Sequence, residues 1–180
     1  AFGQYCIPTA SCVDGDEISS FTFNDIINQF SGCGNTSSAY TNTGITTTVY
    51  KGNSYNLTLD VNTKWEQGYG IWIDYNHDED FDDIDEFVYS SNGSDTNQFS
   101  GSIIISSSAN AGATRMRVRS RYGESFGAND ACSSVSYGET EDYTIIIEES
   151  TIPPAANFTV NTTSTCSGTV GFTDLSDFTP

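Results

Sequence analysis

Positive charge is scarce in this chain of 180 residues. Six Lys and Arg side chains stand against 24 Asp and Glu, which gives a formal net charge of −18 at pH 7. Such a chain repels phosphate backbones and anionic headgroups and attracts cations such as Ca²⁺. We therefore expect no nucleic acid and no anionic membrane surface among its partners.

Long hydrophobic runs are missing as well. The longest purely aliphatic runs are three residues, at 103–105 and 145–147, whereas a membrane-spanning helix needs about 20 apolar residues. We expect no membrane insertion. The N-terminus lacks a charged start and an apolar stretch, so we expect any export signal to have been removed or to lie outside this sequence.

Histidine occurs once, as His77, inside an acidic segment. No Ser-His-Asp or Cys-His arrangement, phosphate-binding loop or dinucleotide fingerprint is present. Paired carboxylates of the kind that glycosidases use are numerous, but metal binding explains them better. The sequence predicts a protein that is not an enzyme.

Cysteine is present in modest number, without C-x-x-C spacing or histidine partners, which argues against a zinc site and for disulfides. Disulfides imply a secreted or cell-surface location; the alternative is five reduced thiols in a cytosolic protein. Four of the five precede residue 133, which predicts two disulfides in a first domain and a lone thiol in a second. The five are Cys6, Cys12, Cys33, Cys132 and Cys166.

Strand patterns dominate, and 11 Phe and 10 Tyr supply material for a core. Alternating or β-branched runs occur at 44–50, 54–61, 68–75, 99–106, 114–122 and 141–148. The segment 18–30 fits a helix or a strand. We predict an all-β fold, an antiparallel β-sandwich of jelly-roll-like or Ig-like type over residues 1–148. A linker at 149–154 and the start of a second β-sandwich at 155–180 follow.

The segment 74–86 places an oxygen-bearing side chain at every second position after an apolar strand. Ca²⁺ takes six to eight oxygen ligands, and D-x-[DN]-x-[DN] spacing supplies them from one loop. The expected ligands are side chains at the first three of these positions, a backbone carbonyl at the fourth, and later acids that close the shell. They are Asp74, Asn76, Asp78, Asp80, Asp82, Asp85 and Glu86.

This loop departs from an EF-hand, because Glu79 stands where Gly usually makes the turn. A calcium loop outside an EF-hand fits better; the alternative is a solvated acidic turn. Eight carboxylates between Asp74 and Glu86 would repel one another without a cation. We expect His77 to point outward as a surface residue.

Four motifs together resemble the GEVED domain over about residues 4–148. They are Tyr5-Cys6-Ile7-Pro8, Trp72-Ile73-Asp74-Tyr75-Asn76, Thr114-Arg115-Met116-Arg117-Val118-Arg119 and Gly138-Glu139-Thr140-Glu141-Asp142-Tyr143. The sequence has Thr140 where the family name has Val, and Glu79 where the family usually has Gly. The first should matter little on an exposed strand position, whereas the second bears on the turn of the calcium loop.

The resemblance implies an accessory binding or adhesion role in secreted or surface proteins of bacteria with a type IX secretion system. Residues 155–180 look like the opening strands of a PKD-like domain, so we expect the chain to end inside its second module. Resting partly on the resemblance, we expect Cys12 to pair with Cys33, which encloses a short loop. Cys6 would then pair with Cys132 and staple the N-terminal segment near the last strand.

Four arginines alternate along one predicted strand and so share one face: Arg115, Arg117, Arg119 and Arg121. They form either a platform for an anionic ligand or a set of cross-strand pairs with the domain's own acids, Glu139 and Glu141 included; we favour the pairs. Glu139, Glu141 and, least of all, Asp142 are alternatively candidates to reach the metal loop. Trp65 is the surface candidate for stacking on a sugar, although core packing is the commoner fate of an aromatic residue.

Three functions follow from these observations. The first is a calcium-stabilised module that mediates adhesion or binds an extracellular protein or polysaccharide. The second is a carbohydrate-binding module of a polysaccharide-degrading enzyme. The third is a structural subunit of a surface layer or filament, which implies a homo-oligomer.

Overall fold

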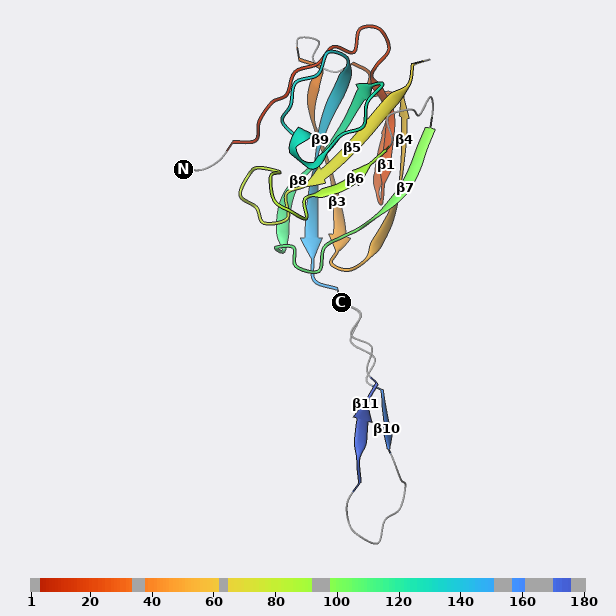
Figure 1. The fold of residues 1–180 in the computed structure, drawn as a ribbon, viewed down its shortest axis with the longest axis vertical. Coiled ribbons are helices and arrows are strands. Elements are labelled where there is room, and N and C mark those ends of the chain that lie inside the picture. The colour runs from red at the N-terminus through yellow and green to blue at the C-terminus, as the bar shows by residue number, and fades with distance from the viewer. Residues whose placement is uncertain are drawn as a thin grey trace. The chain divides into compact units, whose positions relative to one another are not determined.

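The computed structural model describes residues 4–33, 38–61, 65–91, 98–150, 157–160 and 170–175 (Figure 1). The chain divides into two compact units, Ala1–Glu149 and Ser150–Pro180. No helix long and apolar enough to cross a membrane occurs in the part that the structure describes.

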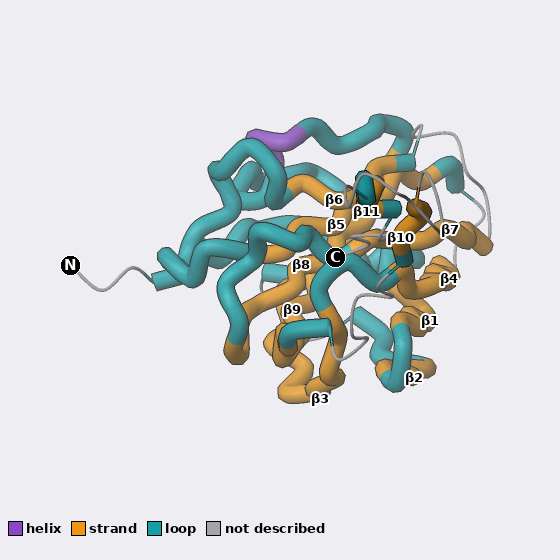
Figure 2. The backbone as a smooth tube through the Cα atoms, turned by 90° about the horizontal axis from the view of Figure 1, so that it is seen from below, coloured by secondary structure: helices purple, strands orange, loops and turns teal. Residues whose placement is uncertain are grey.

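The first unit is a β-sandwich of two sheets, which Figure 2 shows as two layers. The four-stranded sheet has the order β2-β1-β4-β7 and the five-stranded sheet the order β3-β9-β8-β5-β6. The first comprises β1 (Ile18–Phe23), β2 (Ile26–Gln29), β4 (Ser54–Val61) and β7 (Gln98–Ile104). The second comprises β3 (Tyr40–Tyr50), β5 (Gln67–Ile73), β6 (Phe87–Ser90), β8 (Gly112–Tyr122) and β9 (Gly138–Glu148).

One strand pair differs from the predicted antiparallel arrangement. β3 and β9 pair in parallel, with Tyr40 beside Thr140 and Tyr50 beside Glu148. Parallel neighbours cannot be joined by a tight turn. Here most of the domain lies between the two strands in sequence, so the alternation within each segment holds no information about their relative direction.

The predicted strands occur close to their expected positions, and two elements needed the tertiary structure. The segment 18–30, which fitted helix or strand, is the hairpin β1–β2. β6 was not predicted, because it is short and directly follows the acidic loop. The described helical structure is one 3₁₀ turn, η1 (Ala128–Asp130).

The main core lies between the two sheets. It includes Phe21 and Leu59 from the four-stranded sheet and Ile71, Val118 and Ile145 from the five-stranded sheet, all buried. These residues alternate along their strands with side chains on the opposite face, as a pleated strand requires. Burial of this apolar surface is the main stabilising contribution to the fold.

The five-stranded sheet is also covered on its outer face. Trp72 packs there with Phe81, Phe126 and Ala131 in a second buried cluster. Every residue of β5 is therefore buried, including those that alternation would place in solvent. Gly70 permits this packing, because a Cβ at that position would lie 2.4 Å from the Trp72 ring.

The second unit is described only as a hairpin. β10 (Phe158–Val160) pairs with β11 (Phe172–Asp174) in an antiparallel ladder. Cys166, the predicted lone thiol, lies outside the described residues.

Candidate metal centre and its support

The acidic loop, residues 74–86, connects β5 to β6, and Asp74 anchors its start. The Asp74 carboxylate is fully buried and accepts hydrogen bonds from the backbone N–H of His77 at 2.7 Å and of Glu79 at 3.2 Å. It also accepts one from the Tyr5 hydroxyl. This predicted metal ligand thus organises the loop from inside.

Two residues of the loop have left-handed backbone conformations. Glu79 has φ 72° and His77 has φ 66°. Glu79 therefore takes the conformation that Gly usually supplies in such loops, at a cost of roughly 1 kcal/mol. The turn thus forms with Glu in place of Gly.

The expectation that His77 points outward is wrong. Its side chain is half-buried, and a Cβ added to Gly112 would lie 3.3 Å from the imidazole. Its Nε2 is buried and has no hydrogen-bond partner among the described residues. The ring therefore lies against the start of β8.

Phe81 and Glu86 anchor the middle and the end of the loop. Phe81 is buried in the outer cluster, 5.3 Å from the Tyr5 ring between centroids. The buried Glu86 carboxylate accepts a hydrogen bond from the Tyr75 N–H at 2.8 Å through Oε1, whereas Oε2 has no partner among the described residues. Burial, with a contribution from Asp74, raises the pKa of Glu86 to about 7.

Between these anchors the loop gathers an acidic cluster, defined as Asp78, Asp80 and Asp83. One carboxylate oxygen from each lies within 4.8 Å of the others, and all three side chains are exposed. Asn76 joins them, because its Nδ2 donates to Asp78 at 2.9 Å and also to Asp83. Oxygens about 2.4 Å from one Ca²⁺ lie at most about 4.8 Å apart, so the cluster fits that ion.

The seven predicted ligands thus separate into three groups. Asn76, Asp78 and Asp80 come together, Asp74 and Glu86 support the loop from beneath, and Asp82 and Asp85 are exposed outside the cluster. Asp83 was not predicted as a ligand, because it falls outside the alternating series. A cavity of about 270 Å³ is lined by Asn76, Asp83 and Glu86 among others.

The arginine stripe on β8 lies on the outer face of the five-stranded sheet, and its contacts are made to other parts of the same domain. Arg117 is fully buried and forms a bidentate pair with Asp142, with distances of 2.8 Å and 2.9 Å. Its remaining donors reach the Cys6 carbonyl at 2.8 Å and the Ala131 carbonyl at 3.0 Å. The guanidinium also packs over Phe81, with the Arg117 Cζ atom 4.7 Å from the centroid of the Phe81 ring.

Arg119 is also fully buried. It donates to Thr140 Oγ1 at 2.9 Å, to the Ser133 carbonyl at 2.7 Å and to the Asp130 carbonyl. The expectation that Thr140 occupies an exposed position is therefore wrong, because its side chain is buried against Arg119. Burial lowers the pKa of Arg119 to about 9. Arg117 and Arg119 are therefore not accessible as a platform for an anionic ligand. Arg115, partly exposed, lies over the Tyr5 ring at 4.0 Å.

A cross-strand pair between an arginine and an acid of the domain forms as predicted, but the acid is not one of the two that were named. Asp142, which was the weakest candidate for reaching the metal loop, faces Arg117, whereas Glu139 and Glu141 are buried on the opposite face, between the sheets. Register decides this, because Asp142 lies beside Arg117 whereas Glu141 lies beside Val118. Glu139 and Glu141 therefore reach neither the arginines nor the acidic loop.

Both glutamates hold the four-stranded sheet from within the sandwich. Glu139 accepts a hydrogen bond from the Ile18 N–H at 2.7 Å. Glu141 accepts one from the Tyr143 hydroxyl at 2.5 Å and one from Asn28 at 3.3 Å, and burial raises its pKa. The motif Gly138–Tyr143 is thus a structural element whose residues alternate between the two faces of β9.

The two disulfides join the expected cysteines. Cys6 is bonded to Cys132 and Cys12 to Cys33. The first fixes the N-terminal segment to the loop after η1, directly over Arg117, whose Nη1 lies 2.9 Å from Cys6 Sγ. The covalent link and the buried ion pair therefore hold the same segment.

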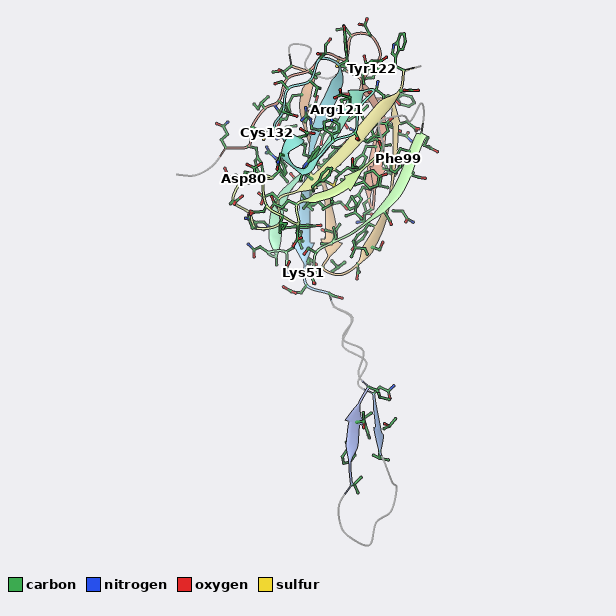
Figure 3. The ribbon with its side chains drawn as sticks, in the orientation of Figure 1. Lys51, Asp80, Phe99, Arg121, Tyr122 and Cys132 are labelled. Carbon is green, nitrogen blue, oxygen red and sulfur yellow. A yellow bond between two sulfur atoms is a disulfide. The ribbon has the colours of Figure 1, made fainter. Side chains whose placement is uncertain are left out.

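Trp65, the predicted surface aromatic residue, is partly exposed at a separate cleft of about 510 Å³. The other residues lining it are Asp14, Asp16, Tyr122 and Tyr137. Trp72, by contrast, is buried in the outer cluster. Figure 3 labels Asp80 on the acidic loop and Tyr122 at the upper end of the domain, apart from each other.

Comparison with known families agrees with these features. The fold and its motifs define a β-sandwich domain, and the family model of the GEVED domain matches residues 68–146. The match runs from β5 through β9 and so includes the acidic loop, the arginine stripe and the motif Gly138–Tyr143. A comparison with curated proteins gives no match.

Proposed function

We propose that the first unit is a non-catalytic, calcium-binding module of a secreted or cell-surface bacterial protein, and that it holds an extracellular partner. The observation that carries this proposal is the acidic cluster, in which Asp78, Asp80 and Asp83 present oxygens within 4.8 Å of one another. Neighbouring carboxylates repel, so a cation there lowers the free energy of the folded loop.

The structure suggests a revised ligand set. Asp78, Asp80 and Asp83 supply carboxylate oxygens, and a rotation of the Asn76 amide brings its oxygen to the same point. Buried Glu86 contributes from beneath through its unpartnered Oε2. Backbone carbonyls and water complete the six to eight ligands that Ca²⁺ takes.

Other features support the wider setting. Two disulfides are compatible with an oxidising, extracellular environment. Nε2 of the one histidine is buried against β8 and has no hydrogen-bond partner in the described part of the chain. For residues 155–180 we propose the opening strands of a PKD-like domain, supported by the antiparallel pair β10–β11.

Calorimetric titration of the chelated protein with Ca²⁺ tests the metal site. We expect saturable binding, and a melting temperature that rises with calcium, because a ligand of the folded state adds about 2.7 kcal/mol at 100 times its Kd. Asp80→Asn and Asp83→Asn should each weaken binding at least tenfold.

Asp82→Asn is the matched control. It removes the same charge from the same loop but lies outside the acidic cluster, so it should change the affinity less than threefold. Absence of measurable heat, together with a melting temperature that calcium leaves unchanged, would contradict the proposal. Equal effects of Asp82→Asn and Asp83→Asn would show a diffuse charge effect instead of a site.

A further inference from the structure

The cleft beside Trp65 is separate from the acidic loop. Trp65 precedes β5 and the acidic loop follows it, so the seven residues of this strand place the two sites roughly 20 Å apart. The volume of about 510 Å³ lies within the range of small-ligand pockets. Its lining comes from the N-terminal segment, the residues before β5, the end of β8 and the residues before β9.

Three aromatic side chains in this cleft are exposed. Trp65 and Tyr137 are each 44% exposed and Tyr122 is 49% exposed. The Trp65 and Tyr122 rings stand at 89° to each other with centroids 6.2 Å apart. A perpendicular pair forms a corner between two π faces, whereas a sugar ring stacks best on one flat face. A compact cation in such a corner contacts both rings.

The charge of the cleft is negative. Asp16 is only 2% exposed, and its Oδ1 accepts a hydrogen bond from Gln67 Nε2 at 2.6 Å. Burial raises the pKa of Asp16, and the neighbouring Asp14 and Glu17 raise it further. Asp14 is exposed at the rim, and none of the described lining residues is cationic. A buried carboxylate in this setting is stabilised by a positive partner.

We propose that this cleft binds an alkylammonium group, held between the π faces of Trp65 and Tyr122 and the carboxylates of Asp14 and Asp16. Its source is either the side chain of a lysine in a basic peptide or a small quaternary ammonium compound. Anionic polysaccharides are repelled by the same carboxylates, and a neutral sugar offers no charge to Asp16. The proposal goes beyond calcium binding and does not depend on it.

Calorimetric titration of the whole chain tests this proposal, with and without a calcium chelator. The probes are choline, Nα-acetyl-lysine amide, the neutral choline analogue 3,3-dimethyl-1-butanol, and cellotetraose. We expect the cations to bind equally well in both conditions and the neutral analogue to bind at least tenfold more weakly. The stronger of the two cationic probes identifies the source.

Variants separate the cleft from general surface charge. Trp65→Ala and Asp14→Asn should each weaken cation binding roughly tenfold. Phe30→Ala and Asp25→Asn, which change exposed residues outside the cleft, are the controls and should leave it unchanged. Asp14 is exposed, so Asp14→Asn tests the charge of the cleft without the risk of unfolding that a change at buried Asp16 would carry.

Two results would overturn the proposal: neither cation binds, or the neutral analogue binds as tightly as choline. If neither cation binds and cellotetraose binds through Trp65, the cleft is a sugar site. None of these results bears on calcium binding at the acidic cluster, which the Asp80→Asn and Asp83→Asn titrations test separately.

Discussion

Arg117 joins four parts of the chain that are distant in sequence. Its guanidinium pairs with Asp142 on β9, donates to the N-terminal segment at Cys6 and to Ala131 beside η1, and lies over Phe81 of the acidic loop. A planar group with five donors suits this position, and a lysine ammonium could not reproduce its bidentate geometry. The residue therefore links the ion pair to the loops that cover the outer face.

Replacing Arg117 should be strongly destabilising. Arg117→Ala leaves the Asp142 carboxylate buried with weakened pairing, so we expect a loss of about 3–5 kcal/mol in the free energy of unfolding. Arg117→Lys should recover only part of it. Arg115→Ala, at a partly exposed residue 3.3 Å from the same carboxylate, is the control and should cost less than about 1.5 kcal/mol.

Urea unfolding with both disulfides intact measures these differences. The double variant Arg117→Met with Asp142→Leu should have a free energy of unfolding far closer to that of the parent than Arg117→Ala has. Replacing both partners of a buried ion pair leaves no unpaired buried charge, whereas replacing one partner does. A loss below 1 kcal/mol for Arg117→Ala would show that the pair is not structural.

At the scale of elements, two disulfides secure the segment that precedes β1. Cys6–Cys132 closes a sequence separation of 126 residues and Cys12–Cys33 one of 21 residues. No strand is assigned in this segment between residues 4 and 17. It is held by the covalent links, by the hydrogen bond from the Gly138 N–H to the Ser11 carbonyl at 2.9 Å, by Tyr5 on Asp74 and by the contacts of Cys6 with Arg117.

Removing the longer link should cost more than removing the shorter one. The chain-entropy relation gives about 5 kcal/mol for a loop of the first length and about 3 kcal/mol for the second. We therefore expect Cys6→Ser with Cys132→Ser to lower the melting temperature more than Cys12→Ser with Cys33→Ser. Differential scanning calorimetry of both variants decides this, and the reverse order would show that the N-terminal latch contributes little.

At the scale of the whole molecule, negative charge dominates both surface and interior. The net charge is −18, and two buried carboxyls distant from the acidic cluster, Asp16 and Glu141, have pKa values raised by burial. A carboxyl with a raised folded pKa binds more protons in the folded state than in the unfolded state. Its contribution to stability is then greatest at low pH and is lost as the pH rises through the folded pKa.

The ion-free protein should therefore become more stable as the pH falls from neutrality through the raised folded pKa values of these carboxyls. Relief of repulsion among surface acids acts in the same direction. Melting temperatures measured in a chelator between pH 5 and 7.5 check this, and Glu141→Gln should flatten the dependence. A melting temperature that falls steadily over that range on acidification would contradict it.

Much of the local structure follows from the sequence. The alternating runs predicted most strands, since one buried and one polar face per strand is the pattern that a sandwich imposes. The disulfide pairs were anticipated with help from the family resemblance. The acidic loop was identified as the metal candidate because its oxygens recur at a spacing that one cation can use.

Three features were decided only by the tertiary structure. The sequence placed the arginines on one face but could not show that the outer face is covered, because that depends on loops distant in the chain. It pointed to Glu139 and Glu141 as partners of the arginines instead of Asp142, since one residue of register exchanges the two faces of a strand. The place of Asp83 in the acidic cluster and the Trp65 cleft were not predicted from the sequence. Their residues come together only when the chain folds, and the spacing of residues along the sequence does not show this.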